Sequence, residues 1–284
     1  MQPDGRFLQQ KKDFWANVRT ISQEVGYTKS KANQILIPDL SQIVTALTRL
    51  DLEIHHIIDG NNRLTVFGEK LMDYFTYRAE VLNTYVEPRL MNAAQAKQHF
   101  EELSAKRTYS CPRPMNKQKG DKKTYAYLTC IINMLIEENA QGLDCDFNPL
   151  SLTTVTRNRR PLRTLARRVD GAFPKTVNPV AVWEVKEYYY TTTFGSRVAD
   201  GVYETLLDGL ELEELRQEEN IDVKHYLMVD AHDTWWAQGK SYLCRMIDML
   251  HMGYVDEVLF GREVIERLPA LVVKWVELAQ KQGF

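Results

Sequence analysis

A strand-like run in the second half of the chain, Val180 to Tyr190, sets the strongest limit on how this sequence can fold. The run is rich in Val, Trp and Tyr, residue types that favour a partly buried strand. Glu184 and Lys186 stand two residues apart within it, so their side chains project from the same face. Asp170 precedes the run, at the end of a short apolar step. We therefore expect two carboxylates and one ammonium group to meet on a sheet.

These three groups have the chemistry of a divalent metal site. Mg²⁺ takes oxygen ligands and keeps several waters, so Asp170 and Glu184 are the candidate metal ligands, and Mn²⁺ is a possible substitute. Lys186 beside the metal-bound water would orient it and offset charge that develops on a phosphate. The alternative is that Glu184 and Lys186 form an ordinary salt bridge on a surface hairpin.

The spacing of these residues resembles that of a known family. Asp170, a gap of 13 residues and then Glu184-Val185-Lys186 resemble the PD-(D/E)XK nuclease superfamily, the fold of many restriction endonucleases. Val169 stands where the motif has Pro. The resemblance covers roughly the second half of the chain. It implies catalytic roles for Asp170, Glu184 and Lys186, and a helix before the first catalytic strand that carries a Glu toward the metal.

Glu137, at the end of the apolar run from Tyr125 to Ile136, is the candidate for that Glu; its alternative is a solvated helix end. The length of the run and its Leu and Met content favour a buried helix over a strand.

Basic residues are concentrated just before Asp170. The net charge is only −2, but the 12 residues RNRRPLRTLARR, from Arg157 to Arg168, hold six arginines and no acid. A lysine cluster lies further upstream. Such clusters next to an acidic site favour the approach of an anionic polymer. We expect phosphate contacts from Arg157, Arg159, Arg160, Arg163, Lys119 and Lys122. For the lysines, a solvated loop is an equally good interpretation.

The order of elements predicts an α/β protein. After the acid-bearing strand, helical and strand-like segments alternate to the end of the chain, which indicates a central mixed sheet flanked by helices, a restriction endonuclease-like core. Residues before Cys111-Pro112-Arg113-Pro114 are mainly helical. We therefore expect a helical subdomain over 1–110 and the α/β core over 111–284.

The N-terminal part offers a different function. Asp39 caps a predicted helix to Leu50, and an earlier helix ends at Gly26. Two helices joined by a polar turn are also the arrangement of a helix-turn-helix, in which the Asp39 helix would read DNA. A non-catalytic DNA-binding regulator is thus the main alternative to a nuclease.

The sequence predicts a cytoplasmic protein. It contains no apolar run of membrane-spanning length, and its first residues lack the apolar core of a signal peptide. The four cysteines are widely spaced, which favours reduced thiols.

These observations together predict a Mg²⁺-dependent endonuclease that cuts double-stranded DNA as a homodimer, in the manner of a sequence-specific type II restriction enzyme. A non-specific phage-defence or DNA-processing nuclease, or one directed at RNA, stays open as an alternative.

Overall fold

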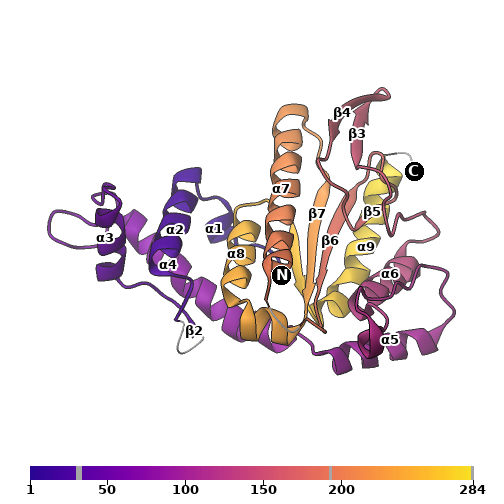
Figure 1. Cartoon of the computed structure of the whole chain (residues 1–284). Coiled ribbons are helices and arrows are strands. Elements are labelled where there is room, and N and C mark those ends of the chain that lie inside the picture. The colour runs from indigo at the N-terminus through magenta and orange to yellow at the C-terminus, as the bar shows by residue number, and fades with distance from the viewer. Residues whose placement is uncertain (30–33, 192–193, 283–284) are drawn as a thin grey trace.

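A mixed four-stranded sheet forms the centre of the second half of the chain (Figure 1). The computed structural model describes residues 1–29, 34–191 and 194–282, and at Lys122 and Arg197 it describes the backbone only. The strand order is β5-β6-β7-β8, in which β5 is antiparallel to β6, and β6, β7 and β8 are parallel. These strands are β5 (Gly171–Phe173), β6 (Ala181–Glu187), β7 (Lys224–Asp230) and β8 (Glu257–Phe260).

Helices cover both faces of this sheet (Figure 1). One face packs on α5 (Ala93–Lys106), α6 (Tyr127–Asn139) and α9 (Glu263–Lys281). The other face packs on α7 (Ser196–Glu219) and α8 (Lys240–His251). Because α7 connects β6 to β7 and α8 connects β7 to β8, the parallel strands are joined by helical crossovers. This arrangement confirms the predicted α/β class with a mixed sheet flanked by helices.

The alternation of side chains along β6 assigns its residues to the two faces. Ala181 and Trp183 belong to the apolar core under α6 and α9, whereas Val182 belongs to the core under α7. Glu184 and Lys186 follow Val182 at intervals of two, so they face α7. A polar pair therefore lies on the buried α7 face of a central strand, as the period of a strand requires.

The N-terminal part is helical, as predicted. Its helices are α1 (Gly5–Leu8), α2 (Lys12–Val25), α3 (Leu40–Arg49) and α4 (Val66–Val81), and they share one apolar core. Asp39 caps α3 through a capping box with Gln42. The chain between α2 and α3 includes two short paired strands, β1 (Thr28–Lys29) and β2 (Gln34–Ile35). This connection is longer than the three- to four-residue turn of a helix-turn-helix.

After α4 the chain continues into a short π-helix (Leu82–Val86) and a 3₁₀ turn (Glu87–Arg89), where the N-terminal helices end. The next helix, α5, contributes Ala96, Phe100 and Leu103 to the core that contains α6 and α9. The packing therefore places α5 with the α/β core, although the sequence placed the boundary near residue 110.

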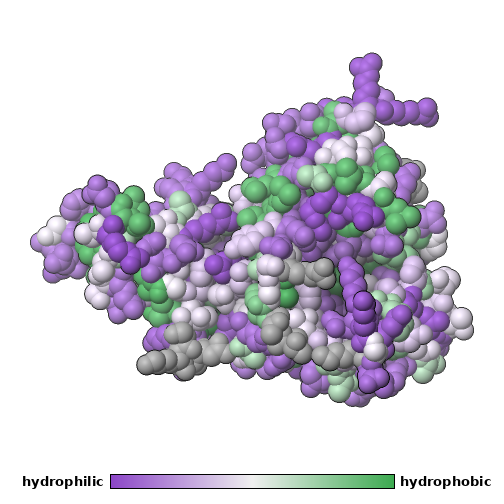
Figure 2. Space-filling view, viewed as in Figure 1, coloured by the Kyte–Doolittle hydropathy of each residue, from purple (hydrophilic) through white to green (hydrophobic). Residues whose placement is uncertain are grey.

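The arginine-rich stretch contributes to a hairpin outside the central sheet. β3 (Thr154–Arg157) pairs with β4 (Arg160–Thr164) in antiparallel fashion. The two turn residues, Asn158 and Arg159, have φ values of 51° and 65°. Positive φ at both central residues is the geometry of a type I′ turn, whose twist suits a two-residue hairpin. The hairpin rises beyond the end of the sheet in Figure 1, and hydrophilic atoms project from that region in Figure 2.

Gly171 in β5 is required by the packing of the aromatic core. A Cβ atom at this position would lie 2.0 Å from Cζ2 of its strand partner Trp183, whose ring stacks on Trp275 at 5.5 Å. We expect Gly171→Ala to lower the free energy of unfolding by about 1–3 kcal/mol, because the ring has no free space to move into. Urea denaturation measures this loss. Gly60→Ala is the matched control, since no atom lies within 4 Å of a Cβ there, and equal stability losses in both variants would contradict the prediction.

No helix within residues 1–29, 34–191 and 194–282 is long and apolar enough to cross a membrane.

Candidate functional site

Glu184 and Lys186 form a buried ion pair on the α7 face of β6. The Lys186 Nζ atom donates a hydrogen bond to Glu184 Oε2 at 2.7 Å. Glu184 is fully buried, and Lys186 is only 5% exposed. The prediction that both side chains share one face is confirmed.

Arg167, which precedes β5, brings a second cation to Glu184. Its Nη1 atom lies 2.8 Å from Glu184 Oε1 and donates to Asp208 Oδ2 at 2.6 Å. Burial by itself opposes the charge on this guanidinium, but Glu184 and Asp208 outweigh it and raise the pKa of Arg167. Arg167 therefore bridges a carboxylate of the sheet and a carboxylate of α7.

Asp170 adjoins Glu184 at the junction of β5 and β6. Its Oδ2 atom accepts a hydrogen bond from the Val185 amide at 2.8 Å, and its own amide donates to Glu184 Oε1 at 3.2 Å. Asp170 remains open to solvent at its surface, in contrast to Glu184. The two acids of the motif thus meet as predicted, one buried and one accessible.

Helix α7 supplies two acids that the sequence did not predict as site residues. Glu204 and Asp208 are spaced at i, i+4 on one side of the helix, with Gly201 one turn earlier. Asp208 is fully buried, whereas the side chain of Glu204 is 45% exposed and lies 3.4 Å from both Lys186 and Arg167. A Cβ at Gly201 would lie 3.1 Å from Cδ of Lys186, so the glycine lets the helix approach the lysine. In the sequence, the feature that could have identified these two acids is their i, i+4 spacing after a glycine.

The six residues Arg167, Asp170, Glu184, Lys186, Glu204 and Asp208 are called the acid–base cluster from here on. It contains four carboxyl groups and two cations. Burial and the charge of Glu184 raise the pKa of Asp208 to about 8. The same two causes raise the pKa of Asp170, whose carboxyl group is hydrogen-bonded to the Val185 amide of the sheet although the residue as a whole is exposed. For Glu184, burial raises the pKa, but Lys186 and Arg167 outweigh it, so this group stays ionised. Among the described residues, the cluster therefore holds more acidic groups than basic ones.

The oxygens of the acid–base cluster suit a hard cation. Asp208 Oδ1 is buried and has no hydrogen-bond partner among the described residues. Within the same residues, no group of three or more His, Cys, Asp or Glu side chains is arranged to hold a metal ion. Mg²⁺ needs only one or two carboxylates, because waters and substrate phosphates complete its shell. Asp170 and Glu184 meet that requirement, and a cation at Glu184 would compete with Arg167.

Glu137, in α6, is bound elsewhere. Its carboxylate accepts hydrogen bonds from the amides of Ser110 at 3.0 Å and Cys111 at 2.5 Å, and Arg107 lies 3.2 Å away. These bonds hold the segment between α5 and α6. Both oxygens are thereby engaged outside the acid–base cluster, and we leave Glu137 out of the proposed site.

The basic residues divide into paired and unpaired groups. Arg157 and Arg163, on the hairpin, pair with Glu219 and Glu214 of α7. Arg159 and Arg160, at the exposed tip, have no ion pair among the described residues. Lys119 is exposed where a 3₁₀ turn (Gly120–Lys122) begins, and the side chain of Lys122 lies outside the described residues.

A separate buried acid, Asp230, lies at the carboxyl end of β7. Its Oδ1 atom accepts hydrogen bonds from the amides of Met91 at 2.7 Å and Ala231 at 2.9 Å, and the Tyr189 hydroxyl donates to Oδ2. Burial nevertheless raises the pKa of Asp230 to about 7. The group is therefore protonated in the folded protein at pH values where the unfolded chain has lost that proton.

Asp230 should make the protein less stable as the pH rises from about 4 to about 7. In this window the folded state binds the extra proton, so stability falls with pH, by at most about 1.4 kcal/mol per pH unit. Asp230→Asn cannot ionise, and we expect its melting temperature to fall less than that of the wild type between about pH 5 and pH 8. Thermal denaturation at several pH values measures this. Asp144→Asn, at an exposed acid, should follow the wild-type curve, and parallel curves for all three proteins would disprove the assignment.

The fold and the cluster define the class of this protein: an α/β domain that holds a buried Glu–Lys pair and an adjoining Asp on its central sheet, preceded by a helical module. Residues 91–275 match the family described as a domain of unknown function, DUF7687, and the chain belongs to that family. Residues 1–85 match a second such family, DUF7690. The two matches meet at the turns after α4. No curated protein and no solved structure matches the chain.

Proposed function

We propose that this protein is a Mg²⁺-dependent endonuclease that hydrolyses phosphodiester bonds of double-stranded DNA. The observation that carries the proposal is the meeting of Asp170 with the Glu184–Lys186 pair at the junction of β5 and β6. The strand order also supports it. The acid-bearing antiparallel pair comes first, and helices then alternate with the parallel strands β7 and β8, which is the order that the resembled nuclease core requires.

Each residue of the site has a distinct role in this proposal. Asp170 and Glu184 would hold the cation, with Mn²⁺ as a substitute for Mg²⁺. When bound, the cation supplies an activated water and polarises the phosphoryl oxygen. Lys186, held against Glu184, orients the attacking water and offsets the charge that develops on the phosphate. The water oxygen forms the new bond to phosphorus as the bond to the leaving sugar oxygen breaks.

Arg167 has a role that follows from its competition with the cation. It now pairs with Glu184 and contacts Asp208, so a cation at Glu184 would release the guanidinium from Glu184. A DNA phosphate beside the cluster is then a new partner for Arg167, because guanidinium groups pair well with phosphate oxygens. Binding of the DNA phosphate would thus favour the arrangement in which Arg167 has left Glu184 and this carboxylate can hold the cation.

The arginine hairpin is the proposed DNA contact. A two-stranded ribbon fits the major groove, and Arg159 and Arg160, at its tip, make no ion pair with any residue that the structure describes. Arg157, Arg163, Lys119 and Lys122 would contribute further phosphate contacts. Cleavage of both strands by a homodimer at a specific site is the form of the activity that we propose first.

Digestion of supercoiled plasmid tests the proposal. We expect cleavage by the wild type with Mg²⁺ and none with EDTA. Asp170→Asn should reduce the rate by at least about 100-fold, because it removes a charged group placed at the reaction centre. Asp170 is at the surface, so this variant should fold normally. Asp144→Asn, at another exposed aspartate, should cleave as the wild type does.

The cleavage products distinguish the kinds of nuclease, and two other outcomes would contradict the proposal. Discrete fragments indicate a restriction enzyme, and a smear indicates a non-specific nuclease. Full activity in Asp170→Asn would remove the assignment. Salt-sensitive DNA binding without cleavage under Mg²⁺ or Mn²⁺ would favour the regulator that uses α3 as its reader.

A further inference from the structure

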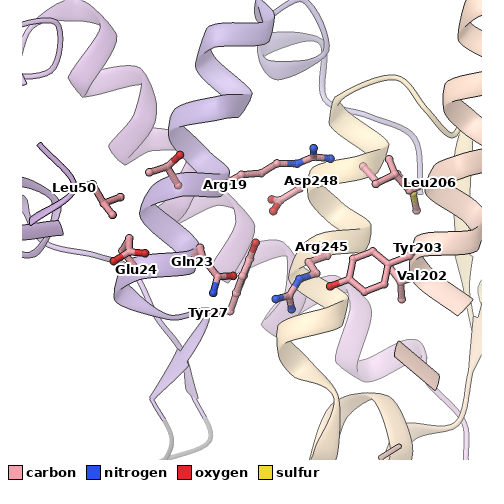
Figure 3. A pocket seen from close by; sticks show the side chains of 12 residues that line it. Arg19, Gln23, Glu24, Tyr27, Leu50, Val202, Tyr203, Leu206, Arg245 and Asp248 are labelled. Atoms are coloured by element: carbon pink, nitrogen blue, oxygen red, sulfur yellow. The ribbon is translucent and has the colours of Figure 1, made fainter. Parts of the chain in front are cut away.

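A second site lies between the two parts of the chain. A cleft of about 530 Å³ separates α2 and the end of α3 from α7 and α8 (Figure 3). Its walls come from both matched segments, 1–85 and 91–275. The volume falls within the range of small-molecule sites, which occur preferentially between domains. It is separate from the acid–base cluster, whose residues do not line it.

The charges that line this cleft do not balance. Glu24 and Asp248 are its two acids, and each already has an arginine partner that lies outside the lining. Glu24 pairs with Arg49, and Asp248 pairs with the buried Arg78 at 3.0 Å. The acids of the lining are thereby neutralised by residues that do not line the cleft.

Two arginines of the lining have no such partner. Arg19 is exposed on α2 and makes no ion pair or hydrogen bond through its side chain among the described residues. Arg245 donates only to the backbone oxygen of Ser241, at 3.1 Å, and has no carboxylate partner in the described part of the chain. Figure 3 shows Arg19 extending from α2 toward α7, and Arg245 lying between Tyr27 and Tyr203. The cleft thus presents two guanidinium groups to whatever enters it.

Aromatic and apolar side chains form the rest of the surface. The Arg245 guanidinium lies 4.2 Å from the ring centroid of Tyr27 and 4.7 Å from that of Tyr242, so it is held in place by stacking. Tyr203, on α7, is 48% exposed and stands next to Val202 and Leu206. A flat ring of a ligand has an apolar and aromatic wall to rest on, within reach of the two cations.

We propose that this cleft binds a free nucleotide. Its phosphate would lie against Arg19 and Arg245, and its base would pack against Tyr203 and the apolar wall. Guanidinium groups pair with phosphate through charge-assisted hydrogen bonds, and bases stack on aromatic side chains. A nucleotide combines these two groups in one small molecule. The proposal does not depend on the nuclease assignment.

The position of the cleft connects its occupant with α7. Glu204 and Asp208 face the acid–base cluster from this helix, whereas Val202, Tyr203 and Leu206 line the cleft. A bound nucleotide would therefore contact the same helix that supplies two acids to the cluster.

Calorimetric titration of the full-length protein tests the proposal. The probes are the four ribonucleoside 5′-monophosphates, the matching nucleosides and inorganic phosphate, all in EDTA so that no metal-dependent binding contributes. We expect at least one monophosphate to bind with a Kd below about 1 mM, and at least about tenfold more tightly than its nucleoside or phosphate. Arg19→Gln/Arg245→Gln should weaken this binding by at least about tenfold.

Two further variants separate this site from others. Tyr203→Ala should weaken binding of the monophosphate while both arginines remain. Arg113→Gln, at an exposed arginine that does not line the cleft, should leave the affinity unchanged. The proposal fails if no monophosphate binds, if phosphate alone binds as tightly, or if Arg113→Gln has the same effect as the cleft variants.

Discussion

Glu184→Gln should lower the free energy of unfolding by about 3–5 kcal/mol, because it breaks a buried charge cluster by removing one partner. Glu184 is fully buried and neutralises Lys186 and Arg167 at 2.7 and 2.8 Å. A neutral amide leaves Lys186 enclosed, with the more distant carboxylate of Glu204 as its remaining ion pair in the described part of the chain. Urea denaturation monitored by circular dichroism measures the loss. The same variant should also cleave plasmid at least about 100-fold more slowly, if Glu184 holds the cation.

Glu204→Gln is the matched control for this prediction. It makes the same chemical change in the same cluster, but its side chain is largely solvated and its two ionic contacts are longer, at 3.4 Å. Such contacts contribute at most about 1 kcal/mol. Equal stability of Glu184→Gln and Glu204→Gln would show that the buried pair does not support the fold as described.

Arg78→Met should cost a similar amount of stability, about 3–5 kcal/mol, for a different reason. Arg78 is buried in α4 and donates to both oxygens of Asp248 in α8, at 3.0 and 3.1 Å. It thereby joins the N-terminal helices to the α/β core. Met fills a similar volume but leaves the Asp248 carboxylate buried, with the Tyr74 hydroxyl at 2.6 Å as its remaining strong partner. Urea denaturation again measures the change.

Two comparisons sharpen the Arg78 prediction. Arg63→Met makes the same substitution at an exposed arginine and should alter stability by no more than about 0.5 kcal/mol. Arg78→Met/Asp248→Leu removes both charges and should recover part of the loss, because no buried charge then lacks a partner. A double variant that is less stable than Arg78→Met would contradict this account.

Local sequence patterns predicted much of the fold. The two-residue period of a strand was enough to place Glu184 and Lys186 on one face, and the alternation of helices and strands was enough to predict the flanked mixed sheet. The arginine stretch was harder to interpret. Asn158 and Arg159 both adopt positive φ, which Arg seldom does, so the turn chemistry that normally marks a hairpin was only half present.

The domain boundary shows how packing overrides composition. The proline-rich stretch after residue 110 has the character of a linker, yet α5 on its N-terminal side packs with α6 in the core. The actual change of module falls at the turns after α4, within a continuous run of helical conformation. Pro88 lies in these turns and is a residue type that ends helices, but only the contacts of α5 show to which side of the division that helix belongs.

The sequence by itself determined the spacing of Asp170, Glu184 and Lys186, the face that the latter two share and the order of strands and helices, because each depends on residues that are near one another along the chain. Only the tertiary structure decided which groups surround them. Asp208 and Arg167 meet at Glu184 because α7 docks across β6, and Glu137 turns away because the segment before α6 takes its oxygens. Such partners are chosen by long-range packing and by the cost of burying a charge alone, which no local pattern encodes.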